Sequence, residues 1–305
     1  MKRNGASQKE IAAAIGKHPS TVSREFRRAG MTSGTYCFVA AQKHAQSREW
    51  KGRCIDQELW NLVELKIREE QWSPEQISDW LAKHSLGQVS HESIYQHIYR
   101  DKQAGGTLHN HFRHRCKSYR KRSSANERRG RLKDQVMIDQ RPSVVDERSR
   151  LGDWEMDTVI GCPGGPVLVT MVERVSRYTL IALAASKEAV AVGGAILSAM
   201  HPHREKVLTM TYDNGKEFAH HALLADLLEA AAYFAHPYHS WERGLNENTN
   251  GLIRQYFPKG SCFAKLTDEE VARVQDKLNS RPRKCLDYAT PNDIFAAPPP
   301  IALAA

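Results

Sequence analysis

The order of strand and helix patterns after residue 150 constrains the fold of this chain more than any other feature. Three short runs rich in aliphatic residues lie close together, and helical and strand patterns then alternate along the chain. The expected strands cover residues 153–161, 166–176, 178–186, 207–213 and 232–238. The expected helices cover residues 190–201, 223–231 and 242–257. Neighbouring strands in hairpins pair antiparallel, whereas strands joined through helices pair parallel, so this order predicts a mixed sheet.

This order of elements is that of the ribonuclease H-like, retroviral integrase-type α/β fold, and it gives three acidic residues defined places. Asp157 falls on the first strand, Asp213 at the end of the fourth, and Glu247 on the helix after the fifth. We expect the sheet to bring them to one edge. Oxygen ligands suit Mg²⁺ or Mn²⁺, and two ions about 3.5–4 Å apart can clamp both reacting oxygens of a phosphodiester. The pattern predicts a two-metal site for phosphoryl transfer that uses Mg²⁺, with Mn²⁺ as a substitute.

Each of these acids also has a simpler interpretation. Asp213 opens the sequence Asp-Asn-Gly, which is common in turns. Asp153 and Glu155 share a strand face with Asp157 and could take its place. Spacing alone does not choose among these alternatives.

The segment around Glu247 is poorly suited to forming only a helix. Gly244 and Gly251 would each cost about 1 kcal/mol relative to alanine in a helix interior, and the three asparagines between them are weak helix formers. Arg254 lies seven residues after Glu247, two turns along the same face, where it could hold a phosphate. The segment therefore favours a role in DNA contact, for which we also select Asn250 and Lys259.

Charge divides the chain into two halves. The whole chain carries a net charge of +9, with +12 in residues 1–150 and −3 in the rest. Such asymmetry is typical of a chain in which one half binds a polyanion and the other half has a different function. Residues 112–133 hold ten Lys and Arg and a single Glu. We interpret this run as a linker that tracks phosphates through Arg120, Lys121 and Arg122, with a plain solvated face as the alternative.

The first 34 residues have the pattern of a helix-turn-helix. Ile11, Ala14 and Ile15 are expected to form one apolar stripe, Gly16 to close the first helix, and Ser20 to cap the second. The second helix would turn Val22 and Phe26 inward. The residues expected in the major groove are Ser20, Thr21, Ser23, Arg24 and Arg27. The alternative is a generic helical hairpin.

A second small helical unit is expected at residues 72–111, after a helical connector at 35–71. Ser73 and Ser90 are predicted helix caps, and Leu86-Gly87 breaks the pair. The expected core residues are Trp72, Ile77, Trp80, Leu81, Ile94, Tyr95 and Ile98. This unit is either a second helix-turn-helix or a helical pair that contacts protein. We expect a basic linker at 112–146, the catalytic domain at 147–297 and a flexible tail at 298–305.

Composition excludes several other classes of protein. No stretch of about 18 apolar residues occurs, and the first residues lack the apolar core of a signal peptide, so we expect a cytoplasmic protein with no membrane partner. The six cysteines form no CxxC pair, which disfavours a zinc ribbon or a disulfide framework. The stretch LHNHFRHRC lacks a ligand pair at zinc-finger spacing, and we do not interpret it as a zinc site.

The chain resembles bacterial DDE transposases of the insertion-sequence 30 family. The resemblance spans nearly the whole chain, and the long motif that contains Glu247 is its most specific part. The matching segments are HPSTVSRE, WSPEQI, VSHESIYQHIY, GDWEMDTVIG, YDNGKEF, PYHSWERGLNENTNGLIRQYFPKG and LNSRPRKCLDYATP. The resemblance implies a catalytic triad of Asp157, Asp213 and Glu247, with Arg254 as the basic residue that follows the glutamate.

The resemblance also implies an activity and its partners. Such enzymes cut double-stranded DNA at the terminal inverted repeats of a mobile element and join a 3′-hydroxyl to target DNA, using Mg²⁺, as homo-oligomers on DNA. The alternatives are a non-catalytic DNA-binding regulator derived from a transposase and a nuclease on the same fold. Family members carry a further helix before the segment that begins here at Ser7. We therefore expect either that Met1 is internal to a longer protein or that residues 35–50 cover the apolar stripe.

Overall fold

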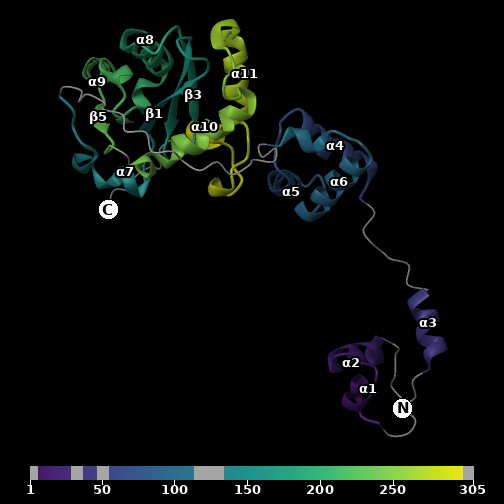
Figure 1. Cartoon of the computed structure of the whole chain (residues 1–305). Coiled ribbons are helices and arrows are strands. Elements are labelled where there is room, and N and C mark those ends of the chain that lie inside the picture. Colours follow the sequence, from purple (N-terminus) through teal and green to yellow (C-terminus); the bar gives the residue numbers. More distant parts are fainter. Residues whose placement is uncertain (1–5, 29–36, 47–54, 113–133, 238, 298–305) are drawn as a thin grey trace. The chain divides into compact units, whose positions relative to one another are not determined.

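A computed structural model describes residues 6–28, 37–46, 55–112, 134–237 and 239–297. The chain divides into two compact units, residues 1–56 and 57–305 (Figure 1). The division falls inside the segment expected to be a connector. The expected boundaries of the smaller domains stay a prediction.

The larger unit contains a five-stranded mixed sheet in the order β3-β2-β1-β4-β5. β1 pairs antiparallel with β2, and β2 pairs antiparallel with β3; β1 pairs parallel with β4, and β4 pairs parallel with β5. The strands are β1 Asp153–Ile160, β2 Val167–Glu173, β3 Thr179–Ala184, β4 Thr209–Tyr212 and β5 Ala231–Phe234. This topology confirms the predicted ribonuclease H-like α/β fold.

Helices cover both faces of the sheet (Figure 1). On one face, Trp154 and Met156 of β1 join a core with α8 and α9. On the other face, Val159 of β1 and Leu168 of β2 pack with α10 and α11. The bounds of the covering helices are α8 Ala189–Met200, α9 His221–Leu228, α10 Gly244–Tyr256, α11 Asp268–Asn279 and α12 Pro291–Ala296. Side chains alternate along β1, so its odd-numbered residues face α10.

The larger unit begins with the helices α4 Gln57–Arg68, α5 Pro74–Lys83 and α6 His91–Gln103. The predicted caps are confirmed: Ser73 accepts a hydrogen bond from Gln76 N, and Ser90 accepts one from Ser93 N. Tyr95, expected in the core, is 41% exposed. That prediction was wrong because Ile94 and Ile98 form the buried stripe, and Tyr95 lies one position off it.

The short helix α7, Ser143–Glu147, follows the basic segment and precedes the sheet. Before it, the stretch around Met137 pairs parallel with Phe234 of β5. Residues 113–133, which carry Arg120, Lys121 and Arg122, lie outside the described residues.

The smaller unit holds α1, Gln8–Ala14, and α2, Pro19–Arg28, with a third helix, α3, at Phe38–Gln46. Ile11, Ala12 and Val22 form its buried core, against which Phe26 packs. Gly16 has φ +62°, as expected for a residue that closes a helix.

Two details of the helix-turn-helix prediction were wrong. Ala14 and Ile15 are exposed, the latter by 54%, because α1 ends at Ala14 and the chain turns away before Ile15 can continue the stripe. Ser20 lies inside α2, which begins at Pro19. The cap contact comes instead from His18, whose Nδ1 accepts the Ser20 N–H at 3.3 Å. A proline suits the first helical position because its missing N–H would have had no partner there.

Candidate active site

Asp157 lies in the middle of β1, opposite Thr170 of β2, and faces α10. Asn250 of α10 donates from Nδ2 to Asp157 Oδ2 at 2.7 Å, and the Thr158 N–H donates to Asp157 Oδ1 at 2.9 Å. Thr170 Oγ1 lies 3.2 Å from Asn250 Oδ1, which fixes the orientation of the asparagine amide. The carboxylate is thus held in one position by the strand and the helix that packs on it.

Asp213 follows directly after the last residue of β4, the strand that pairs parallel with β1. The Gly215 N–H donates to Asp213 Oδ1 at 2.8 Å. A Cβ at Gly215 would lie 2.5 Å from Glu217 Oε2 and 2.7 Å from Asp213 Oδ1, so a larger residue there would make the ends of these two side chains shift. Asn214 Nδ2 donates to the Ala235 carbonyl at 2.7 Å and ties the turn to the end of β5.

Arg243 joins the two aspartates. Its guanidinium lies 3.6 Å from Asp157 Oδ1 through Nη1 and 3.6 Å from Asp213 Oδ2 through Nη2. Nη1 also donates to the Met156 carbonyl at 3.1 Å. Sequence reasoning missed this residue, although its position four residues before Glu247 in the Trp-Glu-Arg-Gly motif was an available signal.

Asp157 lies in a partly buried environment, beside one arginine and a second carboxylate. Burial raises the pKa of the Asp157 carboxyl, the Arg243 guanidinium opposes this rise, and the neighbouring Asp213 adds to it. Two carboxylates thus share one positive group, which occupies the place between them. Since the donors are all oxygens and a positive group already lies there, the pair fits a hard divalent cation.

Glu247 lies on α10 and is exposed, and its carboxylate has no hydrogen-bond or ion-pair partner in the described part of the chain. The three carboxylates do not all lie within 4.8 Å of one another among the residues described. Residues three and four apart share a helix face, so Glu247 lies on one stripe of α10 with Asn250 and Arg254. The structure therefore brings the two aspartates to one arginine, whereas Glu247 lies outside this cluster, on α10.

Arg254, at the far end of this stripe, contacts the last residue of β1. Its Nη2 donates to the Ile160 carbonyl at 2.6 Å, and burial lowers its pKa. Gly244 is the first residue of α10, so the predicted cost of an interior glycine does not apply to it. Gly251 does lie inside the helix.

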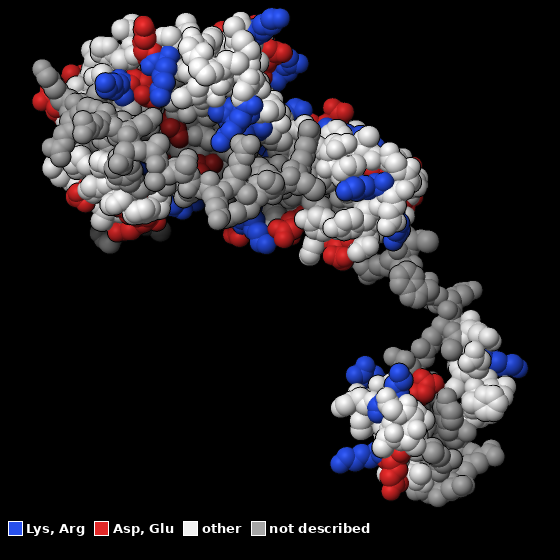
Figure 2. Space-filling model, in the orientation of Figure 1, with Lys and Arg blue, Asp and Glu red and all other residues white. Residues whose placement is uncertain are grey.

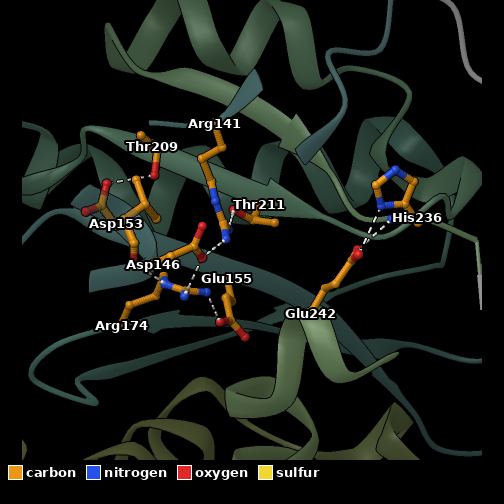
Figure 3. Close-up of polar contacts among 10 residues, drawn as sticks. Arg141, Asp146, Asp153, Glu155, Arg174, Thr209, Thr211, His236 and Glu242 are labelled. Carbon is orange, nitrogen blue, oxygen red and sulfur yellow. Dashed lines mark hydrogen bonds and ion pairs between the residues drawn. The ribbon is translucent and has the colours of Figure 1, made fainter. Parts of the chain in front are cut away.

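Glu155 of β1 belongs to an ion-pair network (Figure 3) and also contacts the first turn of α10. Arg174, which directly follows β2, donates a hydrogen bond to Glu155 Oε1 at 2.6 Å. The other oxygen of this carboxylate, Glu155 Oε2, accepts the N–H of Asn246 in the first turn of α10 at 3.3 Å. Arg174 also pairs with Asp146 of α7 at 3.3 Å, and Asp146 pairs with Arg141. Burial raises the pKa of Glu155, while Arg174 opposes this effect. Glu155, which the sequence offered as an alternative to Asp157, thus makes a different contact, with the backbone at the start of α10.

The predicted DNA-contact residues lie in several places. Thr21, Arg24 and Arg27 are exposed on α2, with Ser20 and Ser23 half-buried beside them. Lys259 is exposed in the turn after α10. Basic and acidic side chains are interspersed over the visible face of the larger unit (Figure 2). None of the described helices is both long and apolar enough to cross a membrane.

Comparisons with known proteins agree with this architecture. The family described as "Helix-turn-helix domain" matches residues 1–29. The chain is 41% identical to the transposase for insertion sequence element IS4351 of Bacteroides fragilis, over 95% of this chain and 90% of that protein. It is 36% identical to the transposase InsI for insertion sequence element IS30A of Escherichia coli, over 95% of this chain and 78% of that protein.

Among solved structures, the catalytic core domain of BIV integrase is 21% identical and covers 48% of this chain and 94% of its own, with a TM-score of 0.38. The simian T-cell lymphotropic virus intasome in complex with PP2A regulatory subunit B56 gamma is 18% identical and covers 67% and 73%, with a TM-score of 0.41.

The mixed sheet, the helix-turn-helix match and the named relatives together place the chain among DNA-acting transposases. The identity over nearly the full length then fixes the family. The chain belongs to the insertion-sequence 30 family of transposases.

Proposed function

We propose that this transposase binds the terminal inverted repeats of an insertion sequence and catalyses DNA strand cleavage and strand transfer by a two-metal mechanism. The observation that carries the proposal is the convergence of Asp157 and Asp213 on a single positive group, Arg243. Asp157 lies on β1 and Asp213 follows directly after the adjacent parallel strand β4, while the helix that bears Glu247 packs on β1 and β2.

Asp157, Asp213 and Glu247 would hold the ions, which we propose to be Mg²⁺, with Mn²⁺ as a substitute. When bound, two such ions polarise the phosphodiester and activate the attacking oxygen, which is water in cleavage and a DNA 3′-hydroxyl in strand transfer. Asn250 keeps the Asp157 carboxylate oriented, because its amide donates to Oδ2. Arg243 must leave the space between the aspartates, and an approaching DNA phosphate offers it a new partner.

The exposed residues supply DNA contacts in this proposal. Thr21, Arg24 and Arg27 on α2, with Ser20 and Ser23, would read the terminal repeats in the major groove. Lys259, in the turn after α10, would contact DNA phosphates near the active site. Homo-oligomers would bring two element ends and the target together.

Three conservative substitutions test the catalytic assignment. Asp157→Asn, Asp213→Asn and Glu247→Gln should each abolish Mg²⁺-dependent cleavage and joining of labelled element ends, because they remove charge from a cation ligand at nearly constant volume. Element-end binding in a gel-shift assay should persist, since the proposed recognition helix lies in the other unit.

Glu205→Gln is the matched control, because Glu205 is exposed in the turn before β4. It should cleave and join like the unaltered protein. Retained cleavage in any of the three active-site variants would remove that residue from the site. Binding without any cleavage in the unaltered chain would favour a regulator derived from a transposase.

A further inference from the structure

A second group of metal-ligating side chains lies outside the carboxylate site, in the loop between β5 and α10. His236, His239 and Glu242 offer ligand atoms that all lie within 4.8 Å of one another. His236 Nδ1 is 2.9 Å and His239 Nδ1 is 3.2 Å from the same atom, Glu242 Oε1 (Figure 3 shows His236 and Glu242). We infer that these three residues form a binding site for a transition-metal ion of the Zn²⁺ or Co²⁺ type, distinct from the carboxylate site.

The chemistry of the donors supports this class of ion. Two imidazole nitrogens and one carboxylate oxygen are a donor set that Zn²⁺ accepts, with a fourth position left for water. Mg²⁺, in contrast, prefers oxygen ligands alone, so the two sites differ in the ion they select. The nitrogen-to-oxygen separations already approach those between ligands on one ion, because Zn–N and Zn–O bonds of about 2 Å leave roughly 3.3 Å between neighbouring ligands of a tetrahedron.

A fourth residue completes the arrangement. Asp139, in the short 3-10 turn Ile138–Gln140, lies 2.9 Å from His236 Nε2 through its Oδ2. A histidine that binds a metal through one ring nitrogen usually donates its other N–H to a carboxylate, which fixes the tautomer. The His236 ring is already oriented in this way, because its Nδ1 points to Glu242 and its Nε2 points to Asp139.

The local backbone holds the ligands in place. Glu242 Oε2 accepts the His236 N–H at 2.8 Å, which closes the loop on itself. The ring of His239 packs against the ring of Trp241, with 4.4 Å between the ring centroids, and Trp241 is 70% exposed. Without metal, the hydrogen bond to Glu242 raises the pKa of His236, so a proton and a metal ion compete for the same nitrogen.

The site adjoins the carboxylate pair in sequence. Arg243 directly follows Glu242 and is the residue that contacts both aspartates. A metal ion in this loop would therefore fix the start of α10 and the reach of Arg243. This consequence rests on the proposed function, whereas the binding of the metal does not.

Titration of the full-length, tag-free protein with Co²⁺ tests the inference. The protein should carry Asp157→Asn and Asp213→Asn so that the carboxylate site does not contribute. We expect one equivalent of Co²⁺ to give the strong visible absorption of a four-coordinate ion, and Zn²⁺ to remove that absorption by displacement. A negative result in this titration would not change the outcome of the cleavage assay that tests the carboxylate site. A negative result in the cleavage assay would likewise not change the outcome of the titration.

Substitutions identify the ligands. His239→Ala removes one ligand from a half-exposed position with little packing, and it should weaken Co²⁺ binding by more than about 100-fold, beyond the effect typical of an outer carboxylate. Asp139→Asn should weaken it by about 10- to 100-fold. His91→Ala is the matched control, because His91 is exposed at the first position of α6, and it should bind Co²⁺ unchanged.

Two results would overturn the inference. The first is the absence of a four-coordinate Co²⁺ spectrum in the double-aspartate variant. The second is a spectrum that survives His239→Ala and Glu242→Gln unchanged, which would assign the ion to other residues. Thermal unfolding of each variant in the absence of metal establishes that the chain is folded when it is titrated.

Discussion

At the scale of single residues, the pair Asp157 and Asp213 depends on side chains that the sequence did not single out. Asn250 orients one carboxylate, Gly215 leaves room for the other, and Arg243 pairs with both. Two partly buried carboxylates this close would repel each other without that cation. Arg243 therefore stabilises the metal-free protein and, in the proposed mechanism, would compete with a divalent ion for the same place.

Arg243→Gln should separate these two effects. In EDTA we expect the variant to lose about 1 kcal/mol, since partly exposed ion pairs contribute roughly that much, which corresponds to a melting temperature lower by about 2–4 °C. The rise in melting temperature on adding Mg²⁺ should be larger than in the unaltered protein, because no guanidinium has to be displaced. Arg204→Gln, at an exposed arginine, is the control. An equal Mg²⁺ effect in variant and parent would exclude the competition.

At the scale of elements, the position of α10 on β1 determines where Glu247 lies. Glu155 anchors the first turn of the helix through the Asn246 N–H, and a carboxylate is favourable there because the helix N-terminus is partially positive. Arg174 balances the buried charge from the other side. Two residues of one strand face, Glu155 and Asp157, thus have separate tasks, one in positioning the helix and one at the site.

Glu155 and Asp146 contact the same arginine but differ in burial, which makes them a matched pair for mutation. Glu155 is 1% exposed, and its change to glutamine leaves the buried Arg174 without its nearest charge, at a cost of about 3–5 kcal/mol. Asp146 is 63% exposed, so Asp146→Asn should cost less than Glu155→Gln, although it also removes the ion pair of the buried Arg141. Chemical denaturation measures both. Similar costs for the two variants would mean that Arg174 does not depend on Glu155.

The element order could be predicted from the sequence because strand and helix periods are local properties. Asp157 and Asp213 could be placed for the same reason, since the strand that bears or precedes each one was recognised. Arg243 and Glu155 act through tertiary contacts with residues far along the chain, and no local period reports such contacts. The errors at Ser20, Ile15 and Tyr95 arose at helix ends and edges, where one position changes the outcome.

At the scale of the whole molecule, the DNA contacts that we propose fall into two kinds. The smaller unit presents Thr21, Arg24 and Arg27 on one helix, a geometry suited to base edges in the major groove. The basic run at residues 112–133 belongs to the other unit and has the composition of a phosphate-binding segment. Specificity and salt-dependent affinity should therefore respond to different mutations.

Neutralising Arg120, Lys121 and Arg122 together should weaken binding to element ends and to random DNA alike. Binding releases fewer counterions when a phosphate contact is lost, so the slope of log affinity against log salt concentration should become shallower by about 0.9 for each lost contact. Arg24→Ala should instead reduce the preference for element ends over random DNA by about 1–3 kcal/mol, as expected for a lost base contact. Its salt slope should change by no more than the amount expected for one lost phosphate contact. Binding measured over a range of salt concentrations on both DNAs checks the two expectations together. An Arg24→Ala variant with unchanged preference would exclude α2 as the recognition helix, and an unchanged salt slope in the triple variant would mean that the basic run lies free of the DNA.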